Sequence, residues 1–225
     1  MKKNNLVKYE IKQTHPGIFA VKVDENYPRA MLFLRYQEHY ESAFPEIKGK
    51  HFDIFEYMEI YRKWKGVDFF SYPRDWAGYN IPGELVESCL NYVLDARNGI
   101  LPTQYDYIMA DVIKEVKSHL KPGKRYYILG VDTFESKTMN HEVCHGLFYV
   151  NTKYKKGAIN LVLGLPRKMY DQIEAFLLEI GYCDEVIVDE IQAFMSTGLV
   201  GGMLKIKGIK KEMSKFEKHF EKYKK

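Results

Sequence analysis

The chain has 225 residues, of which 46% are hydrophobic and 28% charged, and its net charge at pH 7 is +4. This length and composition provide enough apolar surface for a substantial core and exclude a disordered or low-complexity chain. No window contains the roughly 18 uninterrupted apolar residues of a membrane span, and no apolar run follows Lys2 and Lys3, so we expect a cytoplasmic protein with no transmembrane segment.

The cysteines and the distribution of charge narrow the class further. Cys89, Cys144 and Cys183 are odd in number and form no CxxC pair, which disfavours a disulfide framework or a zinc knuckle and predicts reduced thiols. Much of the positive charge lies in residues 205–225, so the rest of the chain is close to neutral. We expect no nucleic-acid partner, and the sequence makes no prediction of the oligomeric state.

Short β-type segments and aromatic helices are expected in the first half of the chain. Residues 7–23 contain the β-type segments, residues 25–42 predict a helix, and a second helix begins after Asp53, a suitable N-cap. Residues 69–83 are rich in aromatics, proline and glycine, which predicts an irregular loop that either packs against the core or forms the rim of a cleft. Pro82 then suits the first turn of a helix that extends to about residue 97.

The second half of the chain is predominantly helical by its apolar periodicity. The clearest amphipathic pattern predicts a long helix over residues 103–120, followed by a short strand. The strand is expected over residues 124–131, and two helices are expected over residues 135–151 and 166–181. Residues 186–198 begin with a brief β-branched run that passes into a short helix.

A short motif within residues 135–151 carries the chemistry. His141 and His145 are four residues apart, so on a helix their imidazoles lie on one face and can reach a single point, as two zinc ligands must. Glu142 is rotated away by about 100° and is suited to act as a general base instead of a third ligand. The structural alternative is an ordinary amphipathic helix, with residues such as Val143 and Cys144 in the core.

These residues form the HExxH motif, and with the order of the elements around it the chain resembles the zincin metallopeptidases, more narrowly the gluzincins. The resemblance covers about 100 of the 225 residues. It implies an α+β zincin-like fold with a small mixed sheet, in which residues 103–120 are a backing helix and residues 125–132 an edge strand that binds extended substrate. A metzincin would need glycine and histidine where this chain has Phe148 and Asn151.

A gluzincin takes its third ligand from a downstream carboxylate. The acids that follow the motif are Glu174, Glu179, Glu185, Asp189 and Glu190. The apolar stripe of residues 166–181 directs Glu174 and Glu179 toward solvent, whereas Asp189 and Glu190 lie between apolar runs, where a carboxylate needs a compensating metal ion or histidine. We therefore predict Glu190 as the ligand and Asp189 as the acid that orients a ligating histidine.

Two alternatives remain open for this acidic pair. Asp189 can be the ligand in place of Glu190, since the position four residues after Glu190, which is often polar in gluzincins, is Phe194 here. The pair can also be an ordinary helix start, with Asp189 as N-cap and Glu190 in solvent. The resemblance further implies a donor to the oxyanion, for which Tyr182 is the first candidate, followed by Tyr170 and Tyr149.

The sequence thus predicts a Zn²⁺-dependent peptidase that acts on a peptide or protein substrate. The metal ligands are His141, His145 and Glu190, with Glu142 and Tyr182 as catalytic residues. Hydrolysis of a non-peptide amide is not distinguishable from this by sequence, and the competing class is a non-catalytic zincin-like binding protein, with structural or absent metal and with partner contacts made by the aromatic residues 69–82.

Three regions are expected along the chain. Residues 1–100 form an N-terminal α+β region, either separate or part of the same domain, and residues 101–202 form the zincin-like core. Residues 203–225 form a lysine-rich amphipathic helix, because their apolar residues recur at spacings of three and four. This helix either docks on the body of the protein or contacts an anionic surface such as a membrane.

Overall fold

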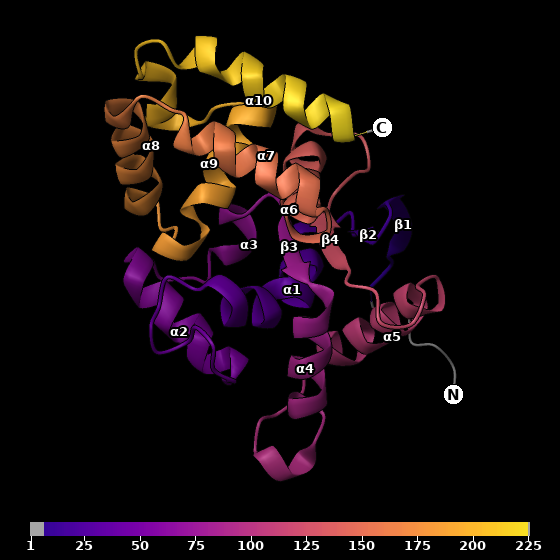
Figure 1. Cartoon of the computed structure of the whole chain (residues 1–225). Helices are drawn as coiled ribbons and strands as arrows, with labels where there is room; N and C mark the ends of the chain where they lie inside the picture. The colour runs from indigo at the N-terminus through magenta and orange to yellow at the C-terminus, as the bar shows by residue number, and fades with distance from the viewer. Residues whose placement is uncertain (1–6, 225) are drawn as a thin grey trace. The chain divides into compact units, whose positions relative to one another are not determined.

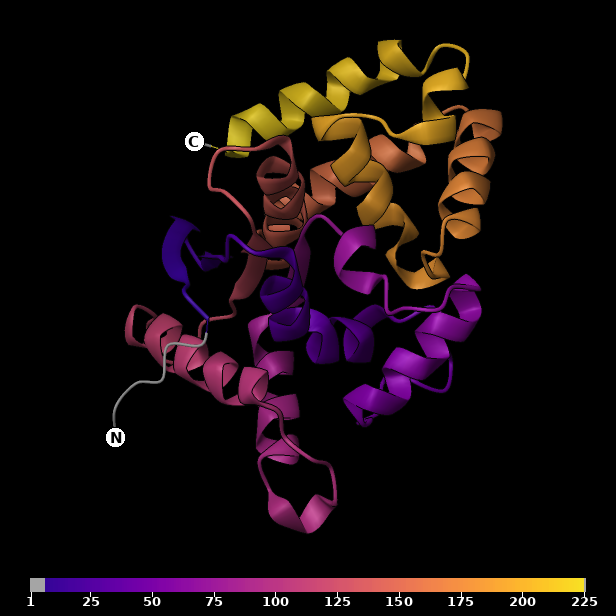
Figure 2. The ribbon, with the colours of Figure 1, turned by 180° about the vertical axis from the view of Figure 1, so that it is seen from behind.

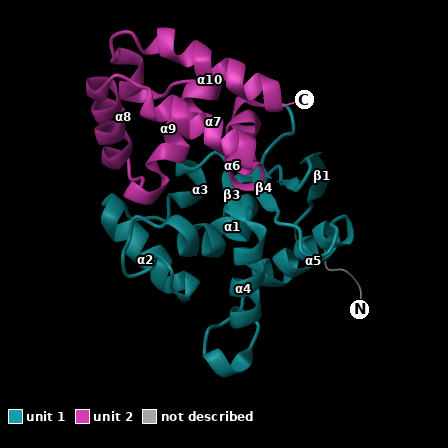
Figure 3. Ribbon diagram, in the orientation of Figure 1, with its two compact units in different colours: residues 1–135 teal, residues 136–225 magenta. Residues whose placement is uncertain are grey.

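The computed structural model describes residues 7–224 and divides the chain into two compact units, Met1–Glu135 (unit 1) and Ser136–Lys225 (unit 2) (Figures 1 and 3). The protein is α+β and mostly helical, with one small mixed sheet, which confirms the predicted class. The resemblance predicts residues 101–202 as one core, whereas the boundary between the two units falls inside this range. Along residues 7–224 no helix has both the length and the apolar character that a membrane crossing requires.

The sheet belongs to unit 1 and has four strands in the order β1-β2-β4-β3. Its strands are β1 (Glu10–His15), β2 (Ile18–Lys22), β3 (Tyr79–Pro82) and β4 (Tyr127–Val131). The β2–β4 pair is parallel and the other two pairs are antiparallel. β4 is buried along its whole length, which agrees with its continuous apolar sequence.

The expectation that residues 125–132 form an edge strand is wrong. β4 pairs with β2 on one side and with β3 on the other, so the backbone groups on both of its sides are already used in the sheet. A substrate strand therefore cannot add to β4. The sequence did not reveal this because β3 comes from the segment that was predicted to be an irregular loop.

The described residues of unit 1 also form five helices. They are α1 (Asn26–Glu41), α2 (Ile54–Lys65), α3 (Tyr72–Asp75), α4 (Gly83–Val93) and α5 (Gln104–Ser118), and a short 3-10 turn lies at Ala96–Asn98. Asp53 caps α2 as predicted, since its carboxylate accepts from the backbone N–H groups of Phe55 and Glu56.

Residues 69–83 are more ordered than predicted. They form α3 and β3 in place of an irregular loop, and Pro82 ends β3 and precedes α4, which stops at Val93. Tyr72 and Tyr79 are buried in the aromatic core of unit 1. Packing is therefore the main role of these aromatic side chains, which was one of the two readings of this segment.

A carboxylate lies among these buried aromatic side chains. Glu38 of α1 is 6% exposed. Burial raises its pKa above the ordinary value, and the nearby hydroxyls of Ser42, Tyr72 and Tyr57 oppose this shift without cancelling it. The native state of unit 1 therefore favours the protonated form of Glu38 more than the unfolded chain does.

Replacement of Glu38 by glutamine should reveal this preference as a pH dependence. Because the folded pKa lies above the unfolded one, the stabilising contribution of Glu38 is complete below about pH 4 and is lost as the pH rises through the folded pKa. The unfolding free energy of the wild type, relative to that of Glu38→Gln, is expected to fall as the pH rises above about 4 in urea titrations. Exposed Glu46→Gln is the control, and a difference that rises with pH would contradict the raised pKa.

Unit 2 consists of helices alone among its described residues. They are α6 (Lys137–Val150), α7 (Thr152–Leu163), α8 (Arg167–Glu179), α9 (Ile187–Thr197) and α10 (Ile209–Tyr223), with 3-10 turns at Asp184–Val186 and Gly201–Lys205. The prediction omitted α7, and residues 186–188 are helical instead of β-type. Burial of Ile187 and Ile191 on one face of α9 outweighs the β preference of the branched residues.

The lysine-rich C-terminal segment docks within unit 2. α10 packs on α7 and α9 and runs along them in both views (Figures 1 and 2), with Phe216 and Phe220 buried. The His219 ring stacks on Tyr154 of α7, and its Nε2 lies 2.9 Å from the Tyr154 carbonyl oxygen. This agrees with the docked reading of residues 203–225.

Candidate metal centre

Two helices of unit 2 bring the candidate residues together. Ser136 caps α6 by accepting from the N–H of Met139, and the helix then carries the two motif histidines on the face that packs against α9. The first turn of α9 carries Asp189 and Glu190. Acidic residues are favourable there because the N-terminal end of a helix carries partial positive charge. The 3-10 turn at Asp184–Val186 leads directly into this helix.

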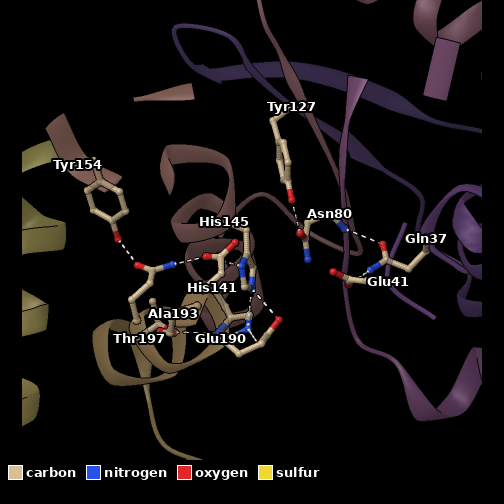
Figure 4. Close-up of polar contacts among 12 residues, drawn as sticks. Gln37, Glu41, Asn80, Tyr127, His141, His145, Tyr154, Glu190, Ala193 and Thr197 are labelled. Carbon is tan, nitrogen blue, oxygen red and sulfur yellow. Dashed lines mark hydrogen bonds and ion pairs between the residues drawn. The ribbon is translucent and has the colours of Figure 1, made fainter. Parts of the chain in front are cut away.

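The Nε2 atoms of the two histidines and the Glu190 carboxylate converge on one point (Figure 4). The two Nε2 atoms are 3.3 Å apart. Glu190 Oε1 lies 3.5 Å from Nε2 of His145, and Oε2 lies 3.6 Å from Nε2 of His141. These separations match those of neighbouring ligands around one ion with metal–ligand bonds of about 2.0–2.2 Å.

The other ring nitrogen of each histidine is held by an oxygen atom. Nδ1 of His145 lies 3.0 Å from Asp189 Oδ1, and Nδ1 of His141 lies 3.3 Å from the Thr197 hydroxyl. That hydroxyl donates to the Ala193 carbonyl oxygen, so it accepts from the His141 ring. Both histidines are thus oriented with Nδ1 protonated and the Nε2 lone pair directed at Glu190, as in metal-ligating histidines.

Positive charge is required where these acceptors meet. Glu190 is 3% exposed and His145 is 2% exposed. Burial raises the pKa of Glu190, but the charge of His145 and the nearby side chains of His141 and Tyr182 outweigh it and keep the pKa below the usual value. Glu190 is therefore a buried anion that needs a cation beside it.

The same charges act on His145 in the opposite sense. Burial lowers its pKa, but the nearby carboxylates of Asp189 and Glu190 reverse the effect and raise the pKa well above the ordinary value. A proton on Nε2 and a metal ion at the point of convergence are therefore alternative ways to neutralise Glu190, and they compete for the same lone pair.

Glu142 is close to this cluster without being one of the converging ligands. It is 5% exposed, and its charge contributes to the raised pKa of His145. Its position directly after His141 on α6 turns it to the side of the Nε2 atoms, as the helical geometry predicts. A carboxylate placed beside the ligand cluster is available to accept a proton.

Tyr182 and Phe194 complete the surroundings of the ligands. Tyr182 hydrogen-bonds to Glu190, and its ring makes an edge contact with Phe194 at 6.2 Å between centroids. Phe194 also packs on the His141 ring, with 4.5 Å between centroids. Phe194, four positions after Glu190, therefore packs against the His141 imidazole.

A further layer behind Asp189 was not predicted from the sequence. Gln192 is fully buried and its Nε2 donates to Asp189 Oδ1 at 2.8 Å. The Tyr154 hydroxyl donates in turn to Gln192 Oε1 at 2.6 Å. This chain of contacts links α7 through α9 to His145, and the buried glutamine within the apolar sequence of α9 was the signal that pointed to it.

The remaining acidic candidates are not among the converging ligands. Tyr170 donates to Glu174 at 3.0 Å on α8, and Glu174, Glu179 and Glu185 do not belong to the described group of potential metal ligands around His141. Cys144 is fully buried, as expected for a core residue, and burial raises the pKa of its thiol. All three cysteines, which lie within residues 7–224, are reduced.

Comparisons of the chain with models of protein families, with curated proteins and with solved structures find no match. Its function is therefore inferred from the chemistry of the site.

Proposed function

We propose that the protein is a zinc-dependent peptidase of gluzincin type, with His141, His145 and Glu190 as the metal ligands. The observation that carries the proposal is the convergence of three buried or half-buried ligand groups, two of which are histidines oriented by oxygen atoms at Nδ1. Two imidazole lone pairs directed at a buried carboxylate are electrostatically unfavourable without a cation between them. The cluster is therefore suited to bind a cation.

The donor set favours zinc over the hard cations. Two imidazole nitrogens and one carboxylate are the ligands that zinc takes in hydrolytic sites, whereas magnesium and calcium prefer oxygen ligands alone. Three protein ligands also leave a coordination position for water or substrate, which separates a catalytic zinc site from a closed structural one. Zinc bound there supplies Lewis-acid activation of a water molecule and of the substrate carbonyl.

The protein's own residues then have distinct roles. Glu142 accepts the proton of the attacking water and returns it to the leaving amine. Asp189 holds His145 in the tautomer that presents Nε2, with Gln192 keeping Asp189 in place. Tyr182 hydrogen-bonds to Glu190. When the Tyr182 hydroxyl leaves that carboxylate, it can donate a hydrogen bond to an oxyanion instead.

Removal and return of the metal tests this function. The full chain should cleave a library of random-sequence dodecapeptides, read by mass spectrometry, and lose this activity on dialysis against a chelator. One equivalent of zinc at the His145-dependent site should restore it. Zinc binding there without cleavage of any peptide would favour the alternative of a non-catalytic binding protein, and absence of zinc binding at that site would contradict the peptidase.

The layer behind Asp189 gives a separate prediction. Tyr154→Phe removes the donor to Gln192 and leaves a buried acceptor with one partner fewer, which is expected to cost about 1–2 kcal/mol of unfolding free energy. Zinc affinity should fall by roughly 10-fold, since groups behind a ligand typically contribute 10- to 100-fold. Competition with a chromophoric chelator measures the affinity, with exposed Tyr107→Phe as the control.

An unchanged zinc affinity in Tyr154→Phe would show that Asp189 does not need this support.

A further inference from the structure

A second group of metal-binding side chains lies in unit 1, separate from the site of α6 and α9. One ring nitrogen each from His39 and His51 and the sulfur of Cys89 lie within 4.8 Å of one another. His39 is near the end of α1, His51 is in the connection between α1 and α2, and Cys89 is in the middle of α4. We propose that these three residues form a second zinc site.

The connection that carries His51 is fixed on both sides of that residue. Nδ1 of His39 lies 2.8 Å from the Lys50 carbonyl oxygen, and the Arg35 guanidinium donates to the Phe52 carbonyl oxygen. Arg35 and His39 are one helical turn apart on α1, so a single helix holds the backbone before and after His51. The imidazole of His51 is therefore presented from a constrained segment.

The hydrogen bond of His39 also fixes its tautomer. A carbonyl oxygen can only accept, so Nδ1 of His39 carries the proton and Nε2 keeps its lone pair. A backbone carbonyl that accepts from one ring nitrogen while the other remains available is the arrangement common to zinc-ligating histidines. His39 is thus prepared as a ligand by a contact that does not depend on the metal.

The ring of His51 is held by stacking. It stacks on His39, at 4.9 Å between ring centroids, and on Tyr92, at 3.8 Å with an interplanar angle of 9°. Tyr92 follows Cys89 by one turn of α4, so the same face of the helix supplies the stacking partner and the thiol. These contacts leave the ring nitrogens at the ring edge, where they can approach a metal.

Cys89 has no other evident chemical use in unit 1. It is fully buried, so its thiol is not exposed to act as a nucleophile. The nearby positive charge of Arg35 is balanced by two contacts with the Asp106 carboxylate, at 2.9 and 3.2 Å. A cation beside Cys89 therefore does not face an unbalanced guanidinium.

The donor set indicates which metal fits. Two imidazoles and one thiolate suit zinc and other borderline or soft ions and do not suit magnesium or calcium. Bonds of about 2.0–2.3 Å place tetrahedral ligand atoms roughly 3.3–3.7 Å apart. Side-chain rotations that move each ligand atom inward by up to about 1 Å are therefore enough to reach these separations. Zinc bound there would tie the connection between α1 and α2 to α4.

Cobalt titration distinguishes this site from the one on α6 and α9, because only the second site contains a thiolate. The full chain, freed of metal by a chelator, should bind two Co²⁺ ions and develop a sulfur-to-cobalt charge-transfer band in the near ultraviolet. Cys89→Ala and His51→Phe should each bind one ion, with the band reduced at least tenfold at the concentration that saturates the wild type. Excess Zn²⁺ should abolish the band.

Matched variants keep the result independent of folding and of the proposed peptidase site. His51→Phe preserves a ring that can stack on Tyr92 and should leave the circular dichroism spectrum unchanged. Glu190→Gln should lose the other ion and keep the band, and Cys183→Ala should behave as the wild type. A saturated wild type without the band, or a band that survives both Cys89→Ala and His51→Phe, would overturn the second site.

Discussion

Replacement of His145 by alanine is expected to abolish zinc binding at the α6–α9 site and to destabilise the protein. The imidazole supplies one ligand atom and is the positive partner of Asp189 and Glu190, whose nearest oxygens lie 3.0 and 3.5 Å from its nitrogens. Without it, Glu190 remains as a buried carboxylate with less compensation. Breaking such a buried pair typically costs about 3–5 kcal/mol.

Two measurements separate these effects. Mass spectrometry under native conditions should show that the variant loses one zinc ion per chain, and urea unfolding in the presence of chelator should show the loss of stability. His119→Ala, at an exposed histidine after α5, is the matched control and should change neither quantity. Retention of the full zinc content by His145→Ala would exclude His145 as a ligand.

Replacement of Glu142 by glutamine is expected to separate metal binding from catalysis. The amide keeps the size of the side chain and removes its ability to accept a proton, so zinc content should stay at the wild-type level. A positioned general base contributes about 10²–10⁴-fold, and kcat/KM for dodecapeptide cleavage should fall by that factor. The decrease should appear mainly in kcat, since substrate binding does not require this carboxylate.

Glu179→Gln provides the control for this experiment, because Glu179 is an exposed acid at the end of α8. It should cleave peptides as the wild type does. Hydrolysis by Glu142→Gln at the wild-type rate would rule out Glu142 as the base, even if zinc is bound by the three proposed ligands.

Local periodicity predicted the parts of the site that depend on one helix. Spacing of four residues placed His141 and His145 on one face, and the apolar residues around Glu190 indicated a buried acid, which is what the structure has. The contact of Asp189 with His145 followed from the same reasoning. These relations need only the geometry of a helix and the cost of burying charge.

Features that depend on contacts between distant segments were not predicted. α7 was missed because its first half is polar and is followed by Gly157, so the support that Tyr154 gives to Gln192 could not be foreseen. The central position of β4 depends on pairing with β3, which lies more than 40 residues earlier in the chain. His39, His51 and Cys89 come together only through the packing of α1 and α4.

Anomalous scattering at the zinc absorption edge, from crystals of the full chain, shows directly whether zinc occupies the α6–α9 site. We expect a peak bonded to Nε2 of His141, Nε2 of His145 and a carboxylate oxygen of Glu190. Crystals grown with excess zinc in which no peak lies within bonding distance of these three residues would contradict this expectation.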